Sequence, residues 1–194
     1  MLKEKRTSAR EKILEAATSL FFEQGYQGTT IDDVVARSGV SRPTLYTHFS
    51  TKEDLGIAYL QLRRQQDLNA LKDAIRKGKT PEGRFLAPIS QVGETLLETD
   101  YRGCRFLNVI VELRERDNPL VKEARRYVEN LNEIIRDVVV ELKASNKKYK
   151  DLDVEKVTDV YHLLMAGAIA CSQECQDRWP VDRAIQEIKS LIPE

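Results

Sequence analysis

The chain has 194 residues and carries equal numbers of basic and acidic side chains, 31 Lys and Arg against 31 Asp and Glu. A hydrophobic fraction of 41% is enough to build a core and excludes a disordered chain. The absence of net charge means that total charge does not indicate a nucleic-acid partner. An odd number of cysteines argues against a secreted disulfide framework, and no apolar run is long enough to span a bilayer. These features predict a cytoplasmic protein without a membrane partner.

The N-terminal segment combines a short basic arm with a capped helix. Residues 1–12 carry an excess of positive side chains, and this arm either enters a DNA minor groove or is disordered. Ser8 and Glu11 have the spacing of a capping box, in which a hydroxyl and an acid satisfy each other's backbone amides. The apolar periodicity predicts a helix from Ser8 to Gln24, ended by Gly25.

Residues 30–54 have the pattern of a helix-turn-helix. A first short helix begins at Thr30 and ends at Gly39, and a second begins at Ser41 with its apolar residues one turn apart. A third helix follows at once, and a second and a third capping box are predicted at Thr30 with Asp33 and at Ser50 with Glu53. This arrangement places one short helix, about residues 42–48, in the DNA major groove.

The rest of the chain is also predicted to be helical, which makes the fold class all-α. A long helix over 52–77 connects a DNA-binding domain, residues 1–52, to a helical regulatory and dimerisation domain, residues 53–194. The clearest break in the chain is Gly78 to Gly83. Further helices are predicted at Glu82–Glu98, Cys104–Arg116, Pro119–Ala144, Val154–Asp177 and Val181–Ile192. The lysines of the stretch SNKKYKD are expected in a solvated loop.

The sequence AREKILEAATSLFFEQGYQGTTIDDVVARSGVSRPTLYTHFSTKEDL closely resembles the DNA-binding domain of the TetR family of bacterial transcription regulators. The match covers Ser8 to Leu55 densely. Residues 84–194 are similar to the family only in architecture, an all-helical domain for ligand binding and dimerisation. The fragment GCxxxNxxxE at Gly103 to Glu112 resembles one branch of the family.

The resemblance implies that the start of the second short helix contacts bases. Arg42 can pair with guanine O6 and N7, or it contacts a phosphate instead. Pro43 can touch a thymine methyl group, and Thr44 contacts either a base or a phosphate. Asp32 and Asp33 would repel phosphate, and they are expected to stabilise the start of the first short helix.

Four further residues are predicted to hold the DNA backbone. Tyr46 and His48 match family positions that usually contact phosphate, or they pack against the following helix. Lys52 stands in the first turn of the long helix at a family position that commonly contacts phosphate. Thr30 can contact phosphate at its helix N-terminus, where amides favour an anion.

One such domain contacts few base pairs, so a homodimer on a near-palindromic double-stranded DNA operator is expected. The helix Val154 to Cys175 is apolar almost all round and must be covered on two sides. With the last helix it resembles the family's four-helix dimer bundle, or it is an internal core helix. The predicted interface residues are Tyr161, Leu164, Ala168, Cys171, Cys175, Ile185 and Ile188.

The family resemblance implies a small-molecule inducer bound in the C-terminal domain. Cys104, Asn108 and Glu112 form one stripe of an otherwise apolar helix, and such polar groups need partners. They face a ligand pocket or satisfy a neighbouring helix. Four further residues, Tyr127, His162, Met165 and Trp179, either line a pocket or belong to the core or the surface.

These features predict a dimeric, sequence-specific DNA-binding regulator, a repressor that a small-molecule ligand releases from its operator. The alternative is a regulator of the same fold that senses oxidants through Cys104, Cys171 or Cys175. The cysteines and His162 do not have metal-ligand spacing. We therefore predict no metal, no cofactor and no enzymatic activity, because the sequence also lacks a partnered nucleophile and a phosphate-binding glycine loop.

Overall fold

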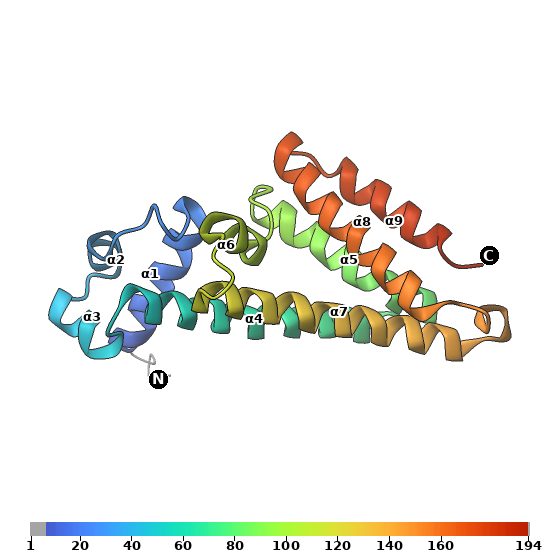
Figure 1. Cartoon of the computed structure of the whole chain (residues 1–194), viewed down its shortest axis with the longest axis horizontal. Helices are drawn as coiled ribbons and strands as arrows, with labels where there is room; N and C mark the ends of the chain where they lie inside the picture. The colour runs from blue at the N-terminus through green and yellow to red at the C-terminus, as the bar shows by residue number, and fades with distance from the viewer. Residues whose placement is uncertain (1–6, 194) are drawn as a thin grey trace, which may run out of the picture. The chain divides into compact units, whose positions relative to one another are not determined.

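The computed structural model describes residues 7–193, and within this range the chain consists of helices joined by short connections without a strand (Figure 1). The helices are, in chain order, α1 (Ala9–Gln24), α2 (Ile31–Ser38), α3 (Arg42–His48), α4 (Lys52–Lys77), α5 (Pro81–Glu98), α6 (Arg105–Leu113), α7 (Pro119–Ser145), the short 3-10 helix η1 (Lys147–Tyr149), α8 (Val154–Cys175) and α9 (Trp179–Ser190). The all-α prediction is confirmed. The first part of the predicted basic arm, residues 1–6, lies outside the described residues. No helix among the described residues has the length and hydrophobicity needed to cross a membrane.

The chain forms two compact units that differ from the predicted domains. One unit comprises residues 1–64 and 105–125, and the other comprises residues 65–104 and 126–194. The predicted boundary at residue 52 therefore falls inside the N-terminal unit. The physical reason is burial, because Leu55 and Tyr59 in the first half of α4 are 0% and 2% exposed and belong to the core of that unit. The sequence break at Gly78 to Gly83 lies within the C-terminal unit.

Side-chain caps mark the starts of the helices in the N-terminal unit. Two of the three predicted capping boxes are confirmed. Ser8 with Glu11 caps α1, and Thr30 with Asp33 caps α2. The box predicted at Ser50 is wrong by one residue. The amide of Thr51 donates to Asp54 over 3.0 Å, and the amide of Asp54 donates to the Thr51 hydroxyl over 2.9 Å. Because α4 begins at Lys52, Thr51 occupies the cap position.

The core of the C-terminal unit lies between α5, α7, α8 and α9, of which α5, α8 and α9 lie side by side (Figure 1). Tyr161 on α8 is fully buried; its hydroxyl donates to the Phe85 carbonyl over 2.9 Å and accepts from the Ile89 amide over 3.2 Å. Burial raises the pKa of this phenol far above its usual range. The Phe85 and Tyr161 rings meet edge to face with centroids 5.4 Å apart.

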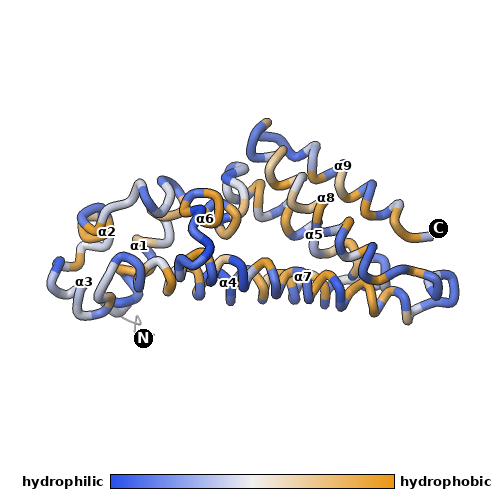
Figure 2. The backbone as a smooth tube through the Cα atoms, in the orientation of Figure 1, coloured by the Kyte–Doolittle hydropathy of each residue, from blue (hydrophilic) through white to orange (hydrophobic). Residues whose placement is uncertain are grey.

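The connection between α7 and α8, residues 146–153, is hydrophilic apart from Tyr149 and Leu152 (Figure 2). Its lysines are exposed, as expected, but Tyr149 in η1 is 1% exposed and packs into the core. The Tyr149 hydroxyl donates to Glu82 over 2.5 Å, and this bond holds the pKa of Glu82 below its usual value. The polar stretch is thus partly a core element rather than only a solvated loop.

Candidate nucleic-acid interface and effector site

The second short helix, α3, presents two different faces. Leu45 on the inner side is 0% exposed, and Phe49 just after the helix is 4% exposed. Ser41 caps the helix by accepting from the Thr44 amide, and Pro43 stands in the first turn, where its missing N–H costs no helical hydrogen bond. The predicted contact residues Arg42, Pro43, Tyr46 and His48 are exposed, whereas Thr44 is half-buried. The sequence and the packing therefore leave one side of α3 available for DNA.

Arg42 has an ion-pair partner in the structure. Its guanidinium lies 2.9 Å from the carboxylate of Asp32 on α2. Both side chains are more than half exposed, so the pair contributes little to stability. Asp33 caps α2 and Asp32 stands in its first turn, as predicted, and Asp32 additionally pairs with Arg42 at the start of α3.

Lys52 lies on an aromatic ring at the start of α4. Its ammonium is 4.5 Å from the centroid of Tyr26, which belongs to the connection between α1 and α2. Burial lowers the pKa of Lys52, and the carboxylates of Glu112 and Asp33 oppose that change. The hydroxyl of Thr30, by contrast, is used by the cap, since it donates to Asp33 over 2.6 Å.

The predicted polar stripe, Cys104, Asn108 and Glu112, is divided between the two units. Cys104 packs against the core of the C-terminal unit, and Asn108 is half-buried on α6 in the N-terminal unit. Glu112 accepts hydrogen bonds from the backbone amides of Tyr26 at 3.1 Å and Gln27 at 2.5 Å. The prediction of Glu112 as a pocket residue is thereby corrected, because both carboxylate oxygens are engaged by the protein.

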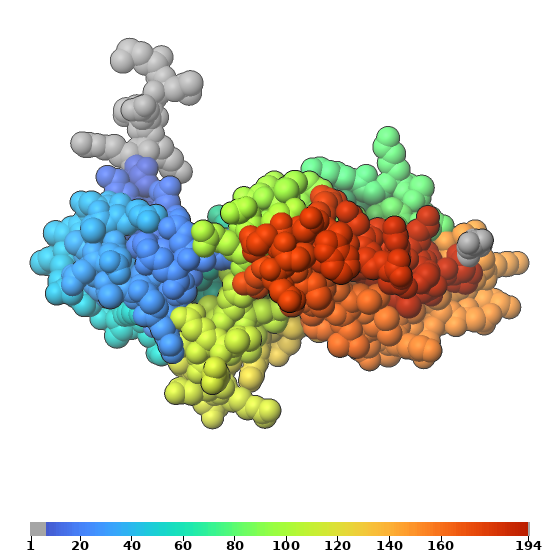
Figure 3. Space-filling view, turned by 90° about the horizontal axis from the view of Figure 1, so that it is seen from above, coloured from blue at the N-terminus to red at the C-terminus, as the bar shows by residue number. Residues whose placement is uncertain are grey.

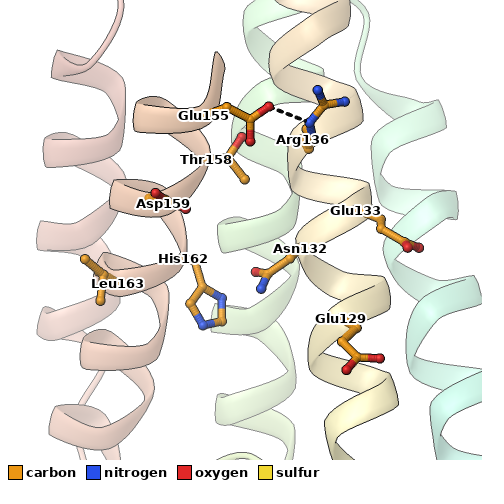
Figure 4. Close-up of a pocket in the computed structure, with 9 residues that line it drawn as sticks. All are labelled: Glu129, Asn132, Glu133, Arg136, Glu155, Thr158, Asp159, His162 and Leu163. Carbon is orange, nitrogen blue, oxygen red and sulfur yellow. Dashed lines mark hydrogen bonds and ion pairs between the residues drawn. The ribbon is translucent and has the colours of Figure 1, made fainter. Parts of the chain in front are cut away.

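A groove of about 550 Å³ lies between α7 and α8 in the C-terminal unit (Figure 4). Of the predicted pocket residues, His162 lines it. Met165 is 1% exposed and Tyr127 is half-buried, and both contribute to the core instead, so Met165 was wrongly assigned to a pocket. Sequence reasoning missed Asn132 and Asp159, which lie on the walls of the groove.

The groove contains polar atoms without a partner among the described residues. Oδ1 of Asn132 and Nδ1 of His162 are buried and make no hydrogen bond there. Burial lowers the pKa of His162, and the carboxylate of Asp159 acts in the opposite direction. Figure 4 shows both side chains directed into the space between the helices.

The charged residues of the groove are predominantly acidic. Its lining includes four carboxylates, Glu129, Glu133, Glu155 and Asp159, and one guanidinium, Arg136. Arg136 is paired with Glu155 over 2.8 Å, so its charge is already compensated. An acidic groove with a buried, unpartnered amide oxygen suits a ligand that carries positive charge and N–H donors.

The predicted dimer interface has the wrong helical register in part. Tyr161, Ala168 and Ile188 are 0%, 5% and 0% exposed, so they are packed within the chain itself and cannot face a partner. Leu164 and Ile185 are half-buried and pack against the same core, whereas Cys171 and Cys175 are exposed. The outer face of α8 consists of Leu163, which is 68% exposed, followed by Gly167, Ala170 and Cys171. Figure 3 shows the end of α8 and α9 at the surface of the C-terminal unit (orange-red and red).

Comparison with known proteins shows which family the chain belongs to. Residues 13–59 match the family described as bacterial regulatory proteins of the tetR family, and residues 94–188 match the tetracyclin repressor-like C-terminal domain. The chain belongs to the TetR family. Like the other members it is a DNA-binding transcription regulator, with an N-terminal helix-turn-helix and a C-terminal helical domain.

The named relatives include both a repressor and an activator of transcription. The transcriptional repressor DhaR of a Mycobacterium species (strain GP1) is 26% identical over 97% of this chain and 94% of its own length. The transcriptional activator FasR of Mycolicibacterium smegmatis is 31% identical over 53% of this chain and 46% of its own length.

Solved structures of the family share the fold. A TetR-family regulator from Streptomyces coelicolor has a TM-score of 0.81 and 26% identity, covering 94% of this chain and 93% of its own. A regulatory protein TetR from Rhodobacter sphaeroides reaches 0.84 at 18% identity, covering 95% and 99% of the two chains.

Proposed function

We propose that this TetR-family regulator is a homodimeric repressor that reads a near-palindromic operator and leaves it when a small molecule binds the C-terminal unit. The observation that carries the DNA-reading part is the exposed, capped N-terminus of α3, where Arg42 is exposed to solvent and Leu45, one turn later, is buried. A guanidinium at the first turn of a recognition helix can pair with guanine in bidentate fashion.

The residues of the interface divide into base contacts and backbone contacts. Arg42, Pro43 and Thr44 contact bases, while Tyr46, His48 and Lys52 hold the phosphates. Thr30 contributes through its helix N-terminus rather than its hydroxyl, because that hydroxyl is committed to Asp33. Arg42 leaves Asp32 when it pairs with a base, and the exposed ion pair is weak enough to be exchanged.

Selection of double-stranded DNA from a random pool by the full-length protein tests this assignment. We expect an enriched near-palindrome with two half-sites about one helical turn apart. The logarithm of affinity for that DNA should fall with the logarithm of salt, by about 0.9 for each phosphate contacted. Enrichment of no sequence, or a slope near zero, would contradict the proposal.

The outer face of α8 is the proposed dimer contact, together with α9. Leu163, Gly167, Ala170 and Cys171 form an exposed strip, and a side chain added at Gly167 would meet nothing within 4 Å, so a partner helix can approach closely there. Replacing Gly167 with Arg should give monomers in analytical ultracentrifugation while the thermal unfolding of the chain persists. An unchanged dimer would exclude this face.

The groove between α7 and α8 is the proposed effector site, and its charge favours a small organic amine. Three six-carbon probes test this: hexylamine, 1-hexanol and hexanoate, which share an alkyl chain and differ in the charge of the head group. We expect binding, measured by the shift of the His162 imidazole resonances, only for the amine. Asp159→Asn should weaken that binding, and Glu174→Gln, at an exposed position on α8 outside the groove, should not. Equal binding of hexanoate would contradict the assignment.

A second candidate signal is thiol oxidation. Cys171 and Cys175 are free, exposed and one helical turn apart on α8. An oxidant should then release the protein from its operator, and Cys171→Ser with Cys175→Ser should abolish that release. Oxidant-driven release that persists in the double variant would exclude these two thiols as the sensor and point to Cys104.

A further inference from the structure

Within the N-terminal unit, helix α6 contacts α1 and the residues that follow α1 through both of its ends. At its start, the Arg105 guanidinium lies 4.4 Å from the centroid of Phe22 on α1, and Arg105 is 8% exposed. At its end, the carboxylate of Glu112 accepts one hydrogen bond on each oxygen, from the amides of Tyr26 and Gln27. These two amides follow α1, outside its hydrogen-bonding ladder, so a carboxylate is a strong partner for them.

Two glycines, Gly25 and Gly56, leave room for the contact between Glu112 and the Tyr26 and Gln27 amides and for the Tyr26 ring. Gly25 has a φ of +82°, a conformation that favours glycine. A side chain at Gly25 would come within 3.1 Å of the Glu112 carboxylate, and one at Gly56 on α4 would come within 2.8 Å of the Tyr26 ring. Glycine at both positions therefore lets Glu112 reach the amides and lets the Tyr26 ring lie against α4.

The Tyr26 ring in turn supports Lys52. The ring packs 5.3 Å from Phe21 between centroids, and the Lys52 ammonium lies over it. Glu112 also favours the charged form of Lys52 electrostatically. Glu112, Tyr26 and Lys52 thus form a continuous series of contacts from the end of α6 to the start of α4.

We infer that Glu112 is a positioning residue for DNA binding. It fixes residues 25–27 so that the Tyr26 ring holds the Lys52 ammonium at the first turn of α4, ready to contact phosphate. Glu112 itself carries a negative charge and touches no DNA. The inference rests on the proposed phosphate contact of Lys52, which is tested separately below.

A double-mutant cycle on the selected DNA tests the inference. Glu112→Gln leaves one acceptor oxygen and places an amide against the second backbone N–H, so we expect binding to weaken about tenfold. The salt dependence should lose about 0.9 from its slope, the value for one phosphate contact. In the Lys52→Met background, Glu112→Gln should have little further effect, because the two changes disrupt the same contact.

The matched control is Glu115→Gln, which removes a carboxylate at an exposed position just after α6. It should bind DNA as the unaltered protein does or slightly tighter. If Glu112→Gln merely lowers the folded fraction, it weakens binding equally in both backgrounds, and additive effects would overturn the inference. Unchanged affinity and salt slope in Glu112→Gln would overturn it as well.

The proposed contact between Lys52 and a DNA phosphate is tested by the salt dependence of binding of the Lys52→Met variant alone. A smaller salt slope supports the phosphate contact whatever Glu112→Gln does. An unchanged slope would exclude the Lys52 contact and with it the role of Glu112, while leaving base reading by Arg42 to be decided by the selected sequence.

Discussion

The helix starts of the N-terminal unit and the core and groove of the C-terminal unit differ in how far apart in the sequence their polar partners lie. In the N-terminal unit, the pairs Ser8–Glu11, Thr30–Asp33 and Thr51–Asp54 are each three residues apart and lie at helix starts. In the C-terminal unit, Tyr161 bonds to Phe85, 76 residues away, and the groove joins residues of α7 to residues of α8. Helix starts built from local contacts can therefore be recognised in a sequence, whereas a groove built from distant residues cannot.

The largest expected effect concerns the core of the C-terminal unit. Tyr161→Ala should lower the free energy of unfolding by about 3 to 5 kcal/mol, because it empties a fully buried aromatic site. Denaturant unfolding measures this change. Loss of dimerisation with stability unchanged would instead return Tyr161 to the interface where the sequence had suggested it.

The second prediction concerns the N-terminal unit, where a substitution in α3 should lower the affinity for DNA rather than the stability of the fold. Arg42→Ala should cost about 1 to 3 kcal/mol of specific DNA binding. The cost should concentrate on one base pair of each half-site, which competition between DNA variants can identify. A uniform loss across all variants would mean that Arg42 contacts phosphate, and an unchanged affinity would exclude both kinds of contact.

The third prediction separates two neighbouring hydroxyls at the start of α4. Thr51→Ala should cost about 1 kcal/mol of stability, because it removes the cap that accepts the Asp54 amide. Ser50→Ala should cost much less and serves as the matched control. Thermal unfolding of the two variants gives the comparison, and the opposite order would restore the cap predicted at Ser50.

A smaller effect is expected on the pKa of His162 in the groove between α7 and α8. Asp159→Asn removes the charge that opposes the burial shift, so the pKa of His162 should fall further below its ordinary value. Since the unfolded chain then binds a proton that the folded chain does not, stability should decline as the pH falls below about 6.5. NMR titration is direct, because the chain has only 2 histidines. A rise in the pKa would contradict the placement of Asp159.

The smallest effect tests the ion pair between α2 and α3. Asp32→Asn removes a negative charge near the DNA and frees Arg42, so binding should tighten a few-fold at low salt, with little change in stability. Fluorescence anisotropy at two salt concentrations measures it. Weaker binding would show that Asp32 orients Arg42 for its base.

The sequence by itself determined the helical fold, the course of α1 to α4 and the exposed side of α3. Helix periodicity and capping act over three or four residues, and a glycine at the left-handed position is a local requirement too. Because capping is local, the predicted cap of α4, Ser50, lies only one residue from the observed cap, Thr51.

The tertiary structure decided which face of a uniformly apolar helix is buried. Helix α8 carries apolar residues almost all round, so its sequence could not distinguish Tyr161, in the core, from Leu163, which is 68% exposed. The partners of polar side chains were decided in the same way. Glu112 bonds to amides 85 and 86 residues away, and such a pairing exists only after the chain has brought α6 to the end of α1.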